Sequence, residues 1–244
     1  SRKHASRRLG GAPVDLRSIK VFPILHREQP YGTLIVGSTA DPRRLSREVE
    51  ATLEAITTQA SVSLANARMY ERMERMATRD GLTNLVNHRH FQELLAGALS
   101  RAERHGFPVS VIFVDADHFK TINDTFGHPV GDEVLRRIAG SLSELARKSD
   151  VVARYGGEEF VLLLEATDAT GAAELAERAR AKIEDLCIDG DFGRLRVTVS
   201  LGVCTFPSHA DGRASLLQRA DQALYEAKRR GRNRVRVYGG GVCA

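Results

Sequence analysis

The chain has 244 residues, with 42% hydrophobic and 27% charged residues and a formal net charge of +5. These are ordinary values for one large globular domain or two modest ones, and the basic excess is too small and dispersed to indicate a nucleic-acid partner. The three cysteines show no CxxC spacing, which argues against a zinc site or a disulfide framework, and no apolar run approaches the roughly 18 residues of a membrane helix. We therefore expect a cytoplasmic protein in a reducing compartment, with no membrane segment in this chain.

The first part of the chain predicts a hairpin followed by a long helix. Residues 1–12 are basic and contain glycine, so we expect them to lack regular structure. Strand-like runs at 19–25 and 32–37 predict the hairpin. A helix is predicted over residues 47–78, because apolar residues recur there at spacings of three and four. The residues that carry this pattern are Leu53, Ile56, Ala60, Leu64 and Ala67, extended by Met69, Met73 and Met76.

The length of that helix leaves two interpretations open. It runs for about 30 residues without glycine or proline, which is long for a helix inside a globular domain. The helix either packs on its own domain or leaves that domain and pairs with a second copy of the chain, and the two interpretations are not exclusive.

Beyond Asp80 and Gly81, which break the helix, the predicted elements alternate. Glycines at 156–157 separate two strand-like runs, a spacing typical of a hairpin. Such a mix predicts an α/β or α+β domain in which helices cover one sheet. The predicted strands lie at 109–114, 151–155, 159–164, 195–206 and 234–238, and the predicted helices lie at 88–105, 130–146, 170–186 and 213–229.

Polar side chains crowd the stretch that follows the first of these strands. Asp115 ends an apolar run, which places its carboxylate at the edge of the sheet, and Glu158 and Glu159 follow the two glycines of the hairpin. If the two strands are neighbours, these carboxylates converge, and oxygen ligands of this kind suit Mg²⁺ and thereby nucleoside triphosphates. Each residue alone is an ordinary turn residue, so the prediction depends on their combination with the polar residues Asp117, Lys120, Asn123, Asp124, His128 and Asp132.

This combination resembles the GGDEF family of diguanylate cyclases over residues 80–238. Residues 156–160 read GGEEF, a common form of the family signature, and are preceded by Arg154 and Tyr155. Asn84 stands where the family usually has glycine and His88 where it has arginine, and neither falls on a position that the family uses for metal or base chemistry. GGEEF alone would be a weak signal, but further blocks follow the family's order at 80–87, 115–124, 127–132, 200–203 and 221–233.

The resemblance implies an α+β fold like the palm of nucleotide cyclases and polymerases, with a mainly antiparallel sheet flanked by helices. It implies that Asp115, Glu158 and Glu159, helped by the Ala116 carbonyl, hold two Mg²⁺ ions per active site, with Mn²⁺ as an alternative ion. The ribose 3′-hydroxyl of one GTP would attack the α-phosphate of the other and expel pyrophosphate, giving cyclic di-GMP. Glu158 is the candidate for drawing off the hydroxyl proton, although metal coordination that lowers the hydroxyl pKa is an alternative route to activation.

The same resemblance implies the substrate contacts. Asn123 and Asp132 would read guanine, because a carboxylate accepts from N1–H and N2–H while an amide bonds with either end, a pattern that adenine fits poorly. Lys120, the second catalytic candidate, would contact the phosphates together with Lys228 and Arg232. Outside this context, a solvated basic helix end would be the simpler interpretation of Lys228 and Arg232.

A possible control site precedes the signature. Residues 147–150 read RKSD and are followed by five residues before Gly156, which resembles the R-x-x-D inhibitory site that binds the product away from the catalytic site. Arg147 would fork onto a guanine edge or a phosphate, and Asp150 would accept from guanine N1–H. Arg178 lies where some family members add a second arginine, and a surface ion pair at a helix end is the alternative interpretation.

Residues 13–70 resemble the C-terminal half of a GAF domain in the order of a hairpin and a helix, without a chemical motif. We therefore expect a partial GAF-like segment at 1–46, a signalling and dimerising helix at 47–79, and the GGDEF domain at 80–240. Because two GTP molecules react, one held by each subunit, we expect a homodimer with GTP as substrate and cyclic di-GMP as product and inhibitor. A degenerate GGDEF module that only binds nucleotide, another nucleotide cyclase and a purely dimerising sensor are the alternatives.

Overall fold

The computed structural model describes residues 7–9, 12–14, 18–27, 29–38, 47–190 and 193–239. The chain divides into two compact units, Ser1–Arg75 and Met76–Ala244. Within the described ranges, no helix combines the length and the apolar character needed to cross a membrane.

The first unit begins with two hairpins. β1 (Arg7–Leu9) pairs antiparallel with β2 (Ala12–Val14), so the expectation that residues 1–12 lack regular structure is wrong where these strands form. β3 (Ser18–His26) and β4 (Gln29–Ser38) form the hairpin that the sequence predicts.

The long helix predicted after the hairpins is α1 (Arg47–Thr78). It turns small hydroxyl residues toward the hairpin: Thr57 and Ser61 are buried and line one cleft with Phe22 of β3. Each hydroxyl donates to the carbonyl four residues earlier, at 2.6 and 2.7 Å, so burial leaves neither hydroxyl unsatisfied. The predicted apolar stripe is therefore only partly on the packed side, and the large apolar residues of α1 that stay exposed are Val49, Ile56, Val62, Leu64, Met69, Tyr70, Met73 and Met76.

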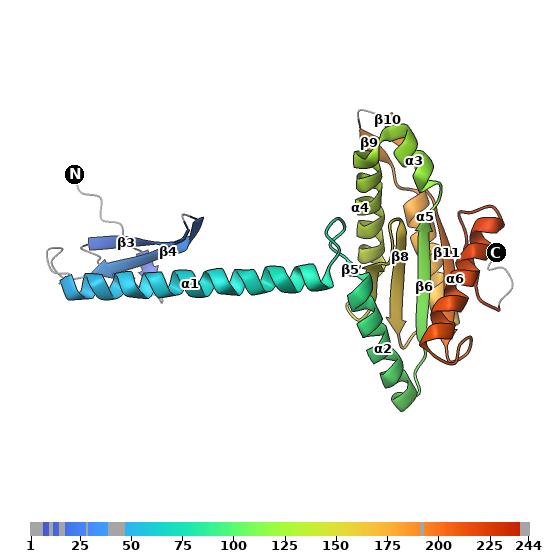
Figure 1. The fold of residues 1–244 in the computed structure, drawn as a ribbon, viewed down its shortest axis with the longest axis horizontal. Coiled ribbons are helices and arrows are strands. Elements are labelled where there is room, and N and C mark those ends of the chain that lie inside the picture. The colour runs from blue at the N-terminus through green and yellow to red at the C-terminus, as the bar shows by residue number, and fades with distance from the viewer. Residues whose placement is uncertain are drawn as a thin grey trace. The chain divides into compact units, whose positions relative to one another are not determined.

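The described part of the second unit is built on a six-stranded sheet with the strand order β12-β11-β6-β8-β7-β5 (Figure 1). The four central strands pair antiparallel and the two edge strands pair parallel with their neighbours, which confirms the predicted α+β fold with a mainly antiparallel sheet. The strands are β5 (Val86–Asn87), β6 (Val109–Ala116), β7 (Val151–Arg154), β8 (Glu159–Glu165), β11 (Val199–Phe206) and β12 (Val235–Val237).

Helices cover both faces of this sheet. Phe113 of β6 belongs to a core cluster with α2 (His88–His105) and α6 (Arg213–Arg229) on one face. Val114, the next residue, belongs to the cluster of the opposite face, which is covered by α3 (Phe119–Phe126), α4 (His128–Leu145) and α5 (Ala169–Glu184). All eight residues of β6 are buried, as expected for a central strand covered on both sides.

Most element positions agree with the sequence prediction, and the exceptions are short. The helix α3 was not predicted, because its eight residues are too few to show a helical period. The hairpin of β9 (Ile188–Gly190) and β10 (Gly193–Leu195) was also missed, so β11 begins at Val199 rather than at residue 195. By contrast, the predicted helix at 88–105 has sharp ends, since the Asn87 side chain accepts from the His90 N–H at its start and Gly106, at φ 73°, ends it.

The contact between β11 and α6 generates a stability prediction. A Cβ atom at Gly202 would lie 2.2 Å from the Leu224 nitrogen and 2.3 Å from the Ala220 carbonyl oxygen, so only glycine lets the helix backbone approach this strand. We expect Gly202→Ala to lower the free energy of unfolding by about 3 kcal/mol, because backbone has to move to admit the methyl group. The measurement is urea unfolding followed by circular dichroism.

Gly140→Ala is the matched control for that substitution. Gly140 is exposed in α4, and a Cβ there would meet no atom within 4 Å. We expect this variant to be as stable as the parent or about 0.5–1 kcal/mol more stable, because alanine is the better helix former. Equal effects of the two substitutions would contradict the close approach of α6 to β11.

Candidate active site

The candidate active site lies where β6 and β8 end side by side. Asp115 of β6 is the direct cross-strand partner of Glu159 of β8. Asp115 is two residues from Phe113, and Glu159 is two residues from Val161, so each points to the same face as that apolar residue. Their carboxylates therefore lie on the sheet face that α2 and α6 cover. The neighbouring strands therefore bring together the carboxylates that the sequence predicts to converge, with Glu158 next to them in the turn.

The turn before β8 is shaped around Glu159. Its carbonyl oxygen accepts from the backbone N–H groups of Tyr155 and Gly156, at 2.8 and 3.2 Å. A Cβ at Gly156 would lie 2.6 Å from the Glu159 Oε2 atom, so the missing side chain makes room for that carboxylate. A Cβ at Gly157 would meet no atom within 4 Å, so the two glycines of the motif are not equivalent in this fold.

One cation from α6 reaches into this acidic edge. The Lys228 Nζ atom lies 2.7 Å from the Asp115 Oδ2 atom, and Asp115 is only 4% exposed. Burial raises the pKa of the Asp115 carboxyl, and the Lys228 ammonium offsets only part of this effect. Burial also raises the pKa of Glu158 and of Glu159, and the negative charge of Asp115 raises both further. The edge therefore carries more negative charge than its own lysine neutralises.

The donor set at this edge fits a hard divalent cation, since it consists of carboxylates whose mutual repulsion a cation would relieve. Across the described residues, no three acidic, histidine or cysteine side chains are already gathered around one point at ligand distance. Lys228 holds Asp115, so carboxylate side chains would have to turn toward an ion.

Asp117 is a buried anchor, to which the sequence assigned no individual role beyond membership of the polar stretch after the strand. Its carboxylate accepts from the Thr198 hydroxyl at 2.8 Å, the Ser200 hydroxyl at 2.7 Å and the Asn233 backbone N–H at 3.0 Å. Asn233 and the preceding Arg232 both have left-handed backbones, with φ values of 44° and 61°. Asp117 thus fixes the loop that carries Arg232, a predicted phosphate contact whose charge also acts on Asp115.

The predicted guanine readers lie on α3 and α4, the helices that follow β6. Asn123 Oδ1 is buried and accepts no hydrogen bond, an unusual state for an amide oxygen inside a protein. A Cβ at Gly131 would lie 2.0 Å from that oxygen, so glycine at this position is needed for the observed amide orientation. Asp132 follows Gly131 directly and is partly exposed. Lys120 is exposed on the first turn of α3, and within the described part of the chain no hydrogen bond or ion pair joins it to the carboxylates.

The predicted inhibitory residues meet in one cavity away from these carboxylates. Arg147, Asp150 and Arg178 line a cavity of about 550 Å³ that also includes Leu145 and Leu175. The Asp150 carboxylate accepts from the Arg147 backbone N–H at 2.8 Å, which leaves the Arg147 guanidinium free of that bond. The alternative of a side-chain ion pair between Arg147 and Asp150 is therefore not what the structure contains.

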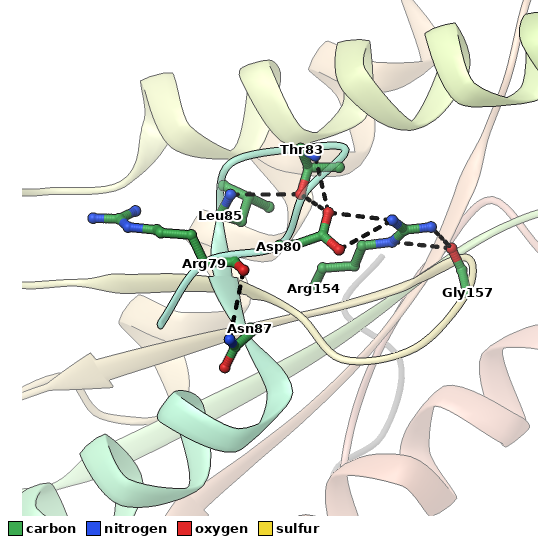
Figure 2. A network of polar contacts seen from close by, with 7 residues as sticks. All are labelled: Arg79, Asp80, Thr83, Leu85, Asn87, Arg154 and Gly157. Carbon is green, nitrogen blue, oxygen red and sulfur yellow. Dashed lines mark hydrogen bonds and ion pairs between the residues drawn. The ribbon is translucent and has the colours of Figure 1, made fainter. Parts of the chain in front are cut away.

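A further polar network was not predicted from the sequence, although Asp80 and Arg154 both lie in motif blocks. Figure 2 shows the Arg154 guanidinium between the Asp80 carboxylate and the Gly157 carbonyl of the GGEEF turn. Only the opposite charges of Asp80 and Arg154 could have indicated that they pair. Because 74 positions separate them in the chain, no local pattern matches these two residues with each other.

The fold and this edge define a class of protein, namely α+β nucleotide-processing domains with carboxylates at the ends of adjacent antiparallel strands. The chain matches the family model described as "Diguanylate cyclase, GGDEF domain" over residues 77–234, and it belongs to that family.

Relatives agree with this assignment. The chain is 35% identical to Diguanylate cyclase A of Treponema denticola over 217 residues, which cover 87% of this chain and 57% of that protein. It is 39% identical to the diguanylate cyclase DgcP of Pseudomonas aeruginosa over 195 residues, covering 80% of this chain and 29% of that protein. The chain therefore spans only part of the length of these relatives.

A solved structure has the same fold. The coiled coil and GGDEF domain of DgcB from Caulobacter crescentus, in complex with c-di-GMP, superposes with a TM-score of 0.68 at 35% identity. The match covers 76% of this chain and 99% of that one.

The Asp117 anchor generates a second stability prediction. Replacing Asp117 with alanine leaves two hydroxyls and one backbone N–H without their acceptor, in a site where Ser200 is fully buried. We expect a loss of about 3 kcal/mol in the free energy of unfolding, measured by urea denaturation. Asp124→Ala, at an exposed position of α3, is the control, and we expect it to change stability by less than about 0.5 kcal/mol. Similar losses in both variants would show that Asp117 is not an anchor.

Proposed function

We propose that this chain condenses two GTP molecules into cyclic di-GMP with release of two pyrophosphates. The observation that carries the proposal is the pairing of Asp115 with Glu159 at the end of adjacent strands, beside Glu158 and the Lys228 ammonium. Membership of the family and the c-di-GMP complex of the DgcB relative support the same reaction. A guanine nucleotide substrate and the free thiols of Cys187 and Cys204 fit a reducing, cytoplasmic setting.

We assign the acidic edge to divalent metal. Asp115, Glu158 and Glu159 would hold Mg²⁺, or Mn²⁺ in its place, with the Ala116 carbonyl as a further oxygen ligand, and two ions per site is the number we propose. When bound, the metal would neutralise the triphosphate and lower the pKa of the ribose 3′-hydroxyl. Glu158, partly exposed at the turn, would accept the hydroxyl proton or pass it to water.

The chain's cations and amides would orient the substrate. Lys228 has three donors, so it can hold the Asp115 carboxylate and still bond a phosphate oxygen. Arg232, held by the Asp117-anchored loop, and Lys120 are the other proposed phosphate contacts. The Asn123 amide, whose oxygen accepts no hydrogen bond here, would turn toward guanine and bond it with either end, while the Asp132 carboxylate would accept from N1–H, a pattern that adenine fits poorly.

We propose that the active form is a homodimer, because each chain offers one set of carboxylates and the reaction joins two nucleotides. Support comes from the exposed apolar side of α1, where Val49, Ile56 and Tyr70 recur at heptad-related spacings of seven and fourteen. Large exposed apolar residues on a helix commonly mark a protein interface. The GAF-like character of the residues before α1, and its role as a signalling helix, remain part of this proposal.

We also propose that cyclic di-GMP binds the cavity of Arg147, Asp150 and Arg178 and inhibits the enzyme. The cavity has the size of a nucleotide site and combines two guanidinium groups with one carboxylate. The guanidinium groups would pair with phosphate or the guanine Hoogsteen edge, and Asp150 would accept from guanine N1–H.

The catalytic proposal predicts the effect of Glu158→Gln. We expect purified protein with GTP and Mg²⁺ to yield cyclic di-GMP, and the variant to be at least about 100-fold slower, because the neutral amide neither binds metal well nor takes a proton. Chromatography of the products after removal of bound nucleotide with a phosphodiesterase is the measurement. Glu103→Gln, at an exposed position of α2, is the matched control and should keep full activity.

The same variant tests the dimer. An excess of Glu158→Gln protein added to the parent should lower the product formed per parent chain, because mixed dimers contain one defective half-site. If the added variant left the product formed per parent chain unchanged, the half-site arrangement would be contradicted. A parent protein that binds GTP as a proven dimer but forms no product would favour the alternative of a binding module.

The inhibitory proposal predicts weaker product binding in Arg147→Ala and Arg178→Ala. Each variant loses charge-assisted hydrogen bonds, so we expect roughly 10- to 100-fold weaker binding of cyclic di-GMP, measured by isothermal titration calorimetry on nucleotide-free protein. Arg136→Ala removes an exposed arginine of α4 that pairs with Glu133, and it should bind like the parent. Unchanged affinity in both cavity variants would place the product elsewhere.

A further inference from the structure

The guanidinium of Arg154, the last residue of β7, bonds the Asp80 carboxylate and the Gly157 carbonyl at the same time. We call this arrangement of Arg154, Asp80 and Gly157 the clamp. The Arg154 Nη1 atom lies 3.2 Å from each oxygen of the Asp80 carboxylate, and the Nη2 and Nε atoms donate to the Gly157 carbonyl oxygen at 2.6 and 3.2 Å. Figure 2 shows the guanidinium group lying between these two partners. The Arg154 and Asp80 side chains are only 18% and 21% exposed, so solvent screens this pair less than it screens a surface pair.

The carbonyl that Arg154 holds belongs to the peptide bond between Gly157 and Glu158. The next carbonyl, that of Glu158 itself, accepts from the Ala116 N–H at 3.3 Å. Both peptide planes around the Glu158 Cα atom are therefore fixed by hydrogen bonds, one from Arg154 and one from β6. Because two fixed planes define where the side chain leaves the backbone, they set the direction of the Cα–Cβ bond from which the Glu158 carboxylate extends.

Side-chain packing at Gly157 does not fix the orientation of its carbonyl group. A Cβ at Gly157 would meet no atom within 4 Å, so the space on that side of the backbone is open. Glycine has the widest choice of backbone dihedrals, and a glycine turn without contacts would sample several of them. The Arg154 bonds are the contacts that remain to select one orientation of the Gly157 carbonyl.

Asp80 is in turn held in place. Its Oδ1 atom accepts from the Thr83 N–H and hydroxyl at 2.9 and 2.7 Å. Burial acts to raise the pKa of the Asp80 carboxyl, but the hydrogen bonds from Thr83 and Arg154 outweigh it, and the pKa lies below its usual value. Nearby, the Asn87 amide donates to the Ala77 carbonyl in the last turn of α1 at 2.9 Å, so this helix end belongs to the same polar region.

We infer that Arg154 is a positioning residue for the metal-binding carboxylates, acting through the Gly157 carbonyl and held by Asp80. This role rests on the proposed function for the reaction and for the assignment of metal to the carboxylates, whereas the hydrogen bonds of Arg154 are a property of the fold. Loss of the clamp would leave the nucleotide contacts on α3 and α4 in place and would misdirect Glu158.

The test compares Arg154→Lys and Asp80→Asn with Arg137→Lys, a control in an exposed ion pair with Glu133 on α4. Lysine keeps the charge at position 154 but has no fork that reaches both partners. Asparagine at position 80 keeps an oxygen for Thr83 but places an N–H group against the Arg154 N–H. The first readout is Mg²⁺ affinity, taken from the thermal stabilisation of the protein by Mg²⁺ in the presence of a non-cyclisable GTP analogue. The second readout is kcat and KM for GTP.

We expect both clamp variants to bind Mg²⁺ about 10-fold more weakly and to lose 10- to 100-fold in kcat, while KM for GTP stays within about 2-fold. The Arg154→Ala/Asp80→Ala double variant should lose no more Mg²⁺ affinity than Arg154→Ala alone, because both substitutions remove one interaction. Lower thermal stability with unchanged Mg²⁺ affinity and kcat would overturn the inference and leave Arg154 a structural residue. If the parent forms no cyclic di-GMP, the proposed function fails, and the Mg²⁺ readout still decides the clamp.

Discussion

The antiparallel register between β6 and β8 is the constraint on which the rest of the site depends. It puts Asp115 opposite Glu159 at the point where both strands leave the core, and it does so because seven consecutive residue pairs, ending with this one, are in register. A shift by one residue would move every side chain of one strand to the other face of the sheet. Both strands are packed into a core cluster on each face, so such a shift would force both clusters to repack, and this packing fixes the spacing of the charges.

Gathering carboxylates at a buried edge costs stability, and the surrounding structure compensates in specific ways. Lys228 neutralises part of the charge on Asp115, while burial and, second to it, the negative charge of Asp115 raise the pKa values of Glu158 and Glu159. The mutual repulsion of these carboxylates is what makes the edge attractive to a divalent cation. The site is thus prepared electrostatically by the fold, while the final direction of the carboxylates depends on the ligand.

The loops around the edge are fixed by polar anchors rather than by packing. Asp117, which directly follows β6, holds the loop of Arg232, and Arg154 of β7 holds the GGEEF turn. Each anchor spans segments that are far apart in the chain, so each ties the sheet edge to a different part of the domain. The anchor of Arg154 on Asp80 lies two residues after the end of α1 in the chain, and the Asn87 amide donates to the Ala77 carbonyl in the last turn of that helix.

Several features of this protein follow from the sequence alone. The motif blocks identify the family, the apolar run before Asp115 predicts a buried strand, and the glycines at 156–157 predict the hairpin that presents Glu158 and Glu159. These signals are local, because strand period, turn residues and motif spacing are written in neighbouring positions. The resemblance to a GAF domain and the roles of the individual site residues remain predictions.

Other features were decided only by the tertiary structure. The Asp80–Arg154 clamp joins residues 74 positions apart, and the Asp117 bond to Asn233 joins residues 116 positions apart, so neither has a local pattern. The sequence also did not predict which side of α1 is packed. The hairpin contacts the small residues Thr57 and Ser61 and leaves Ile56 exposed. Periodicity shows where apolar residues recur along a helix, but the shape of the partner decides which side is buried.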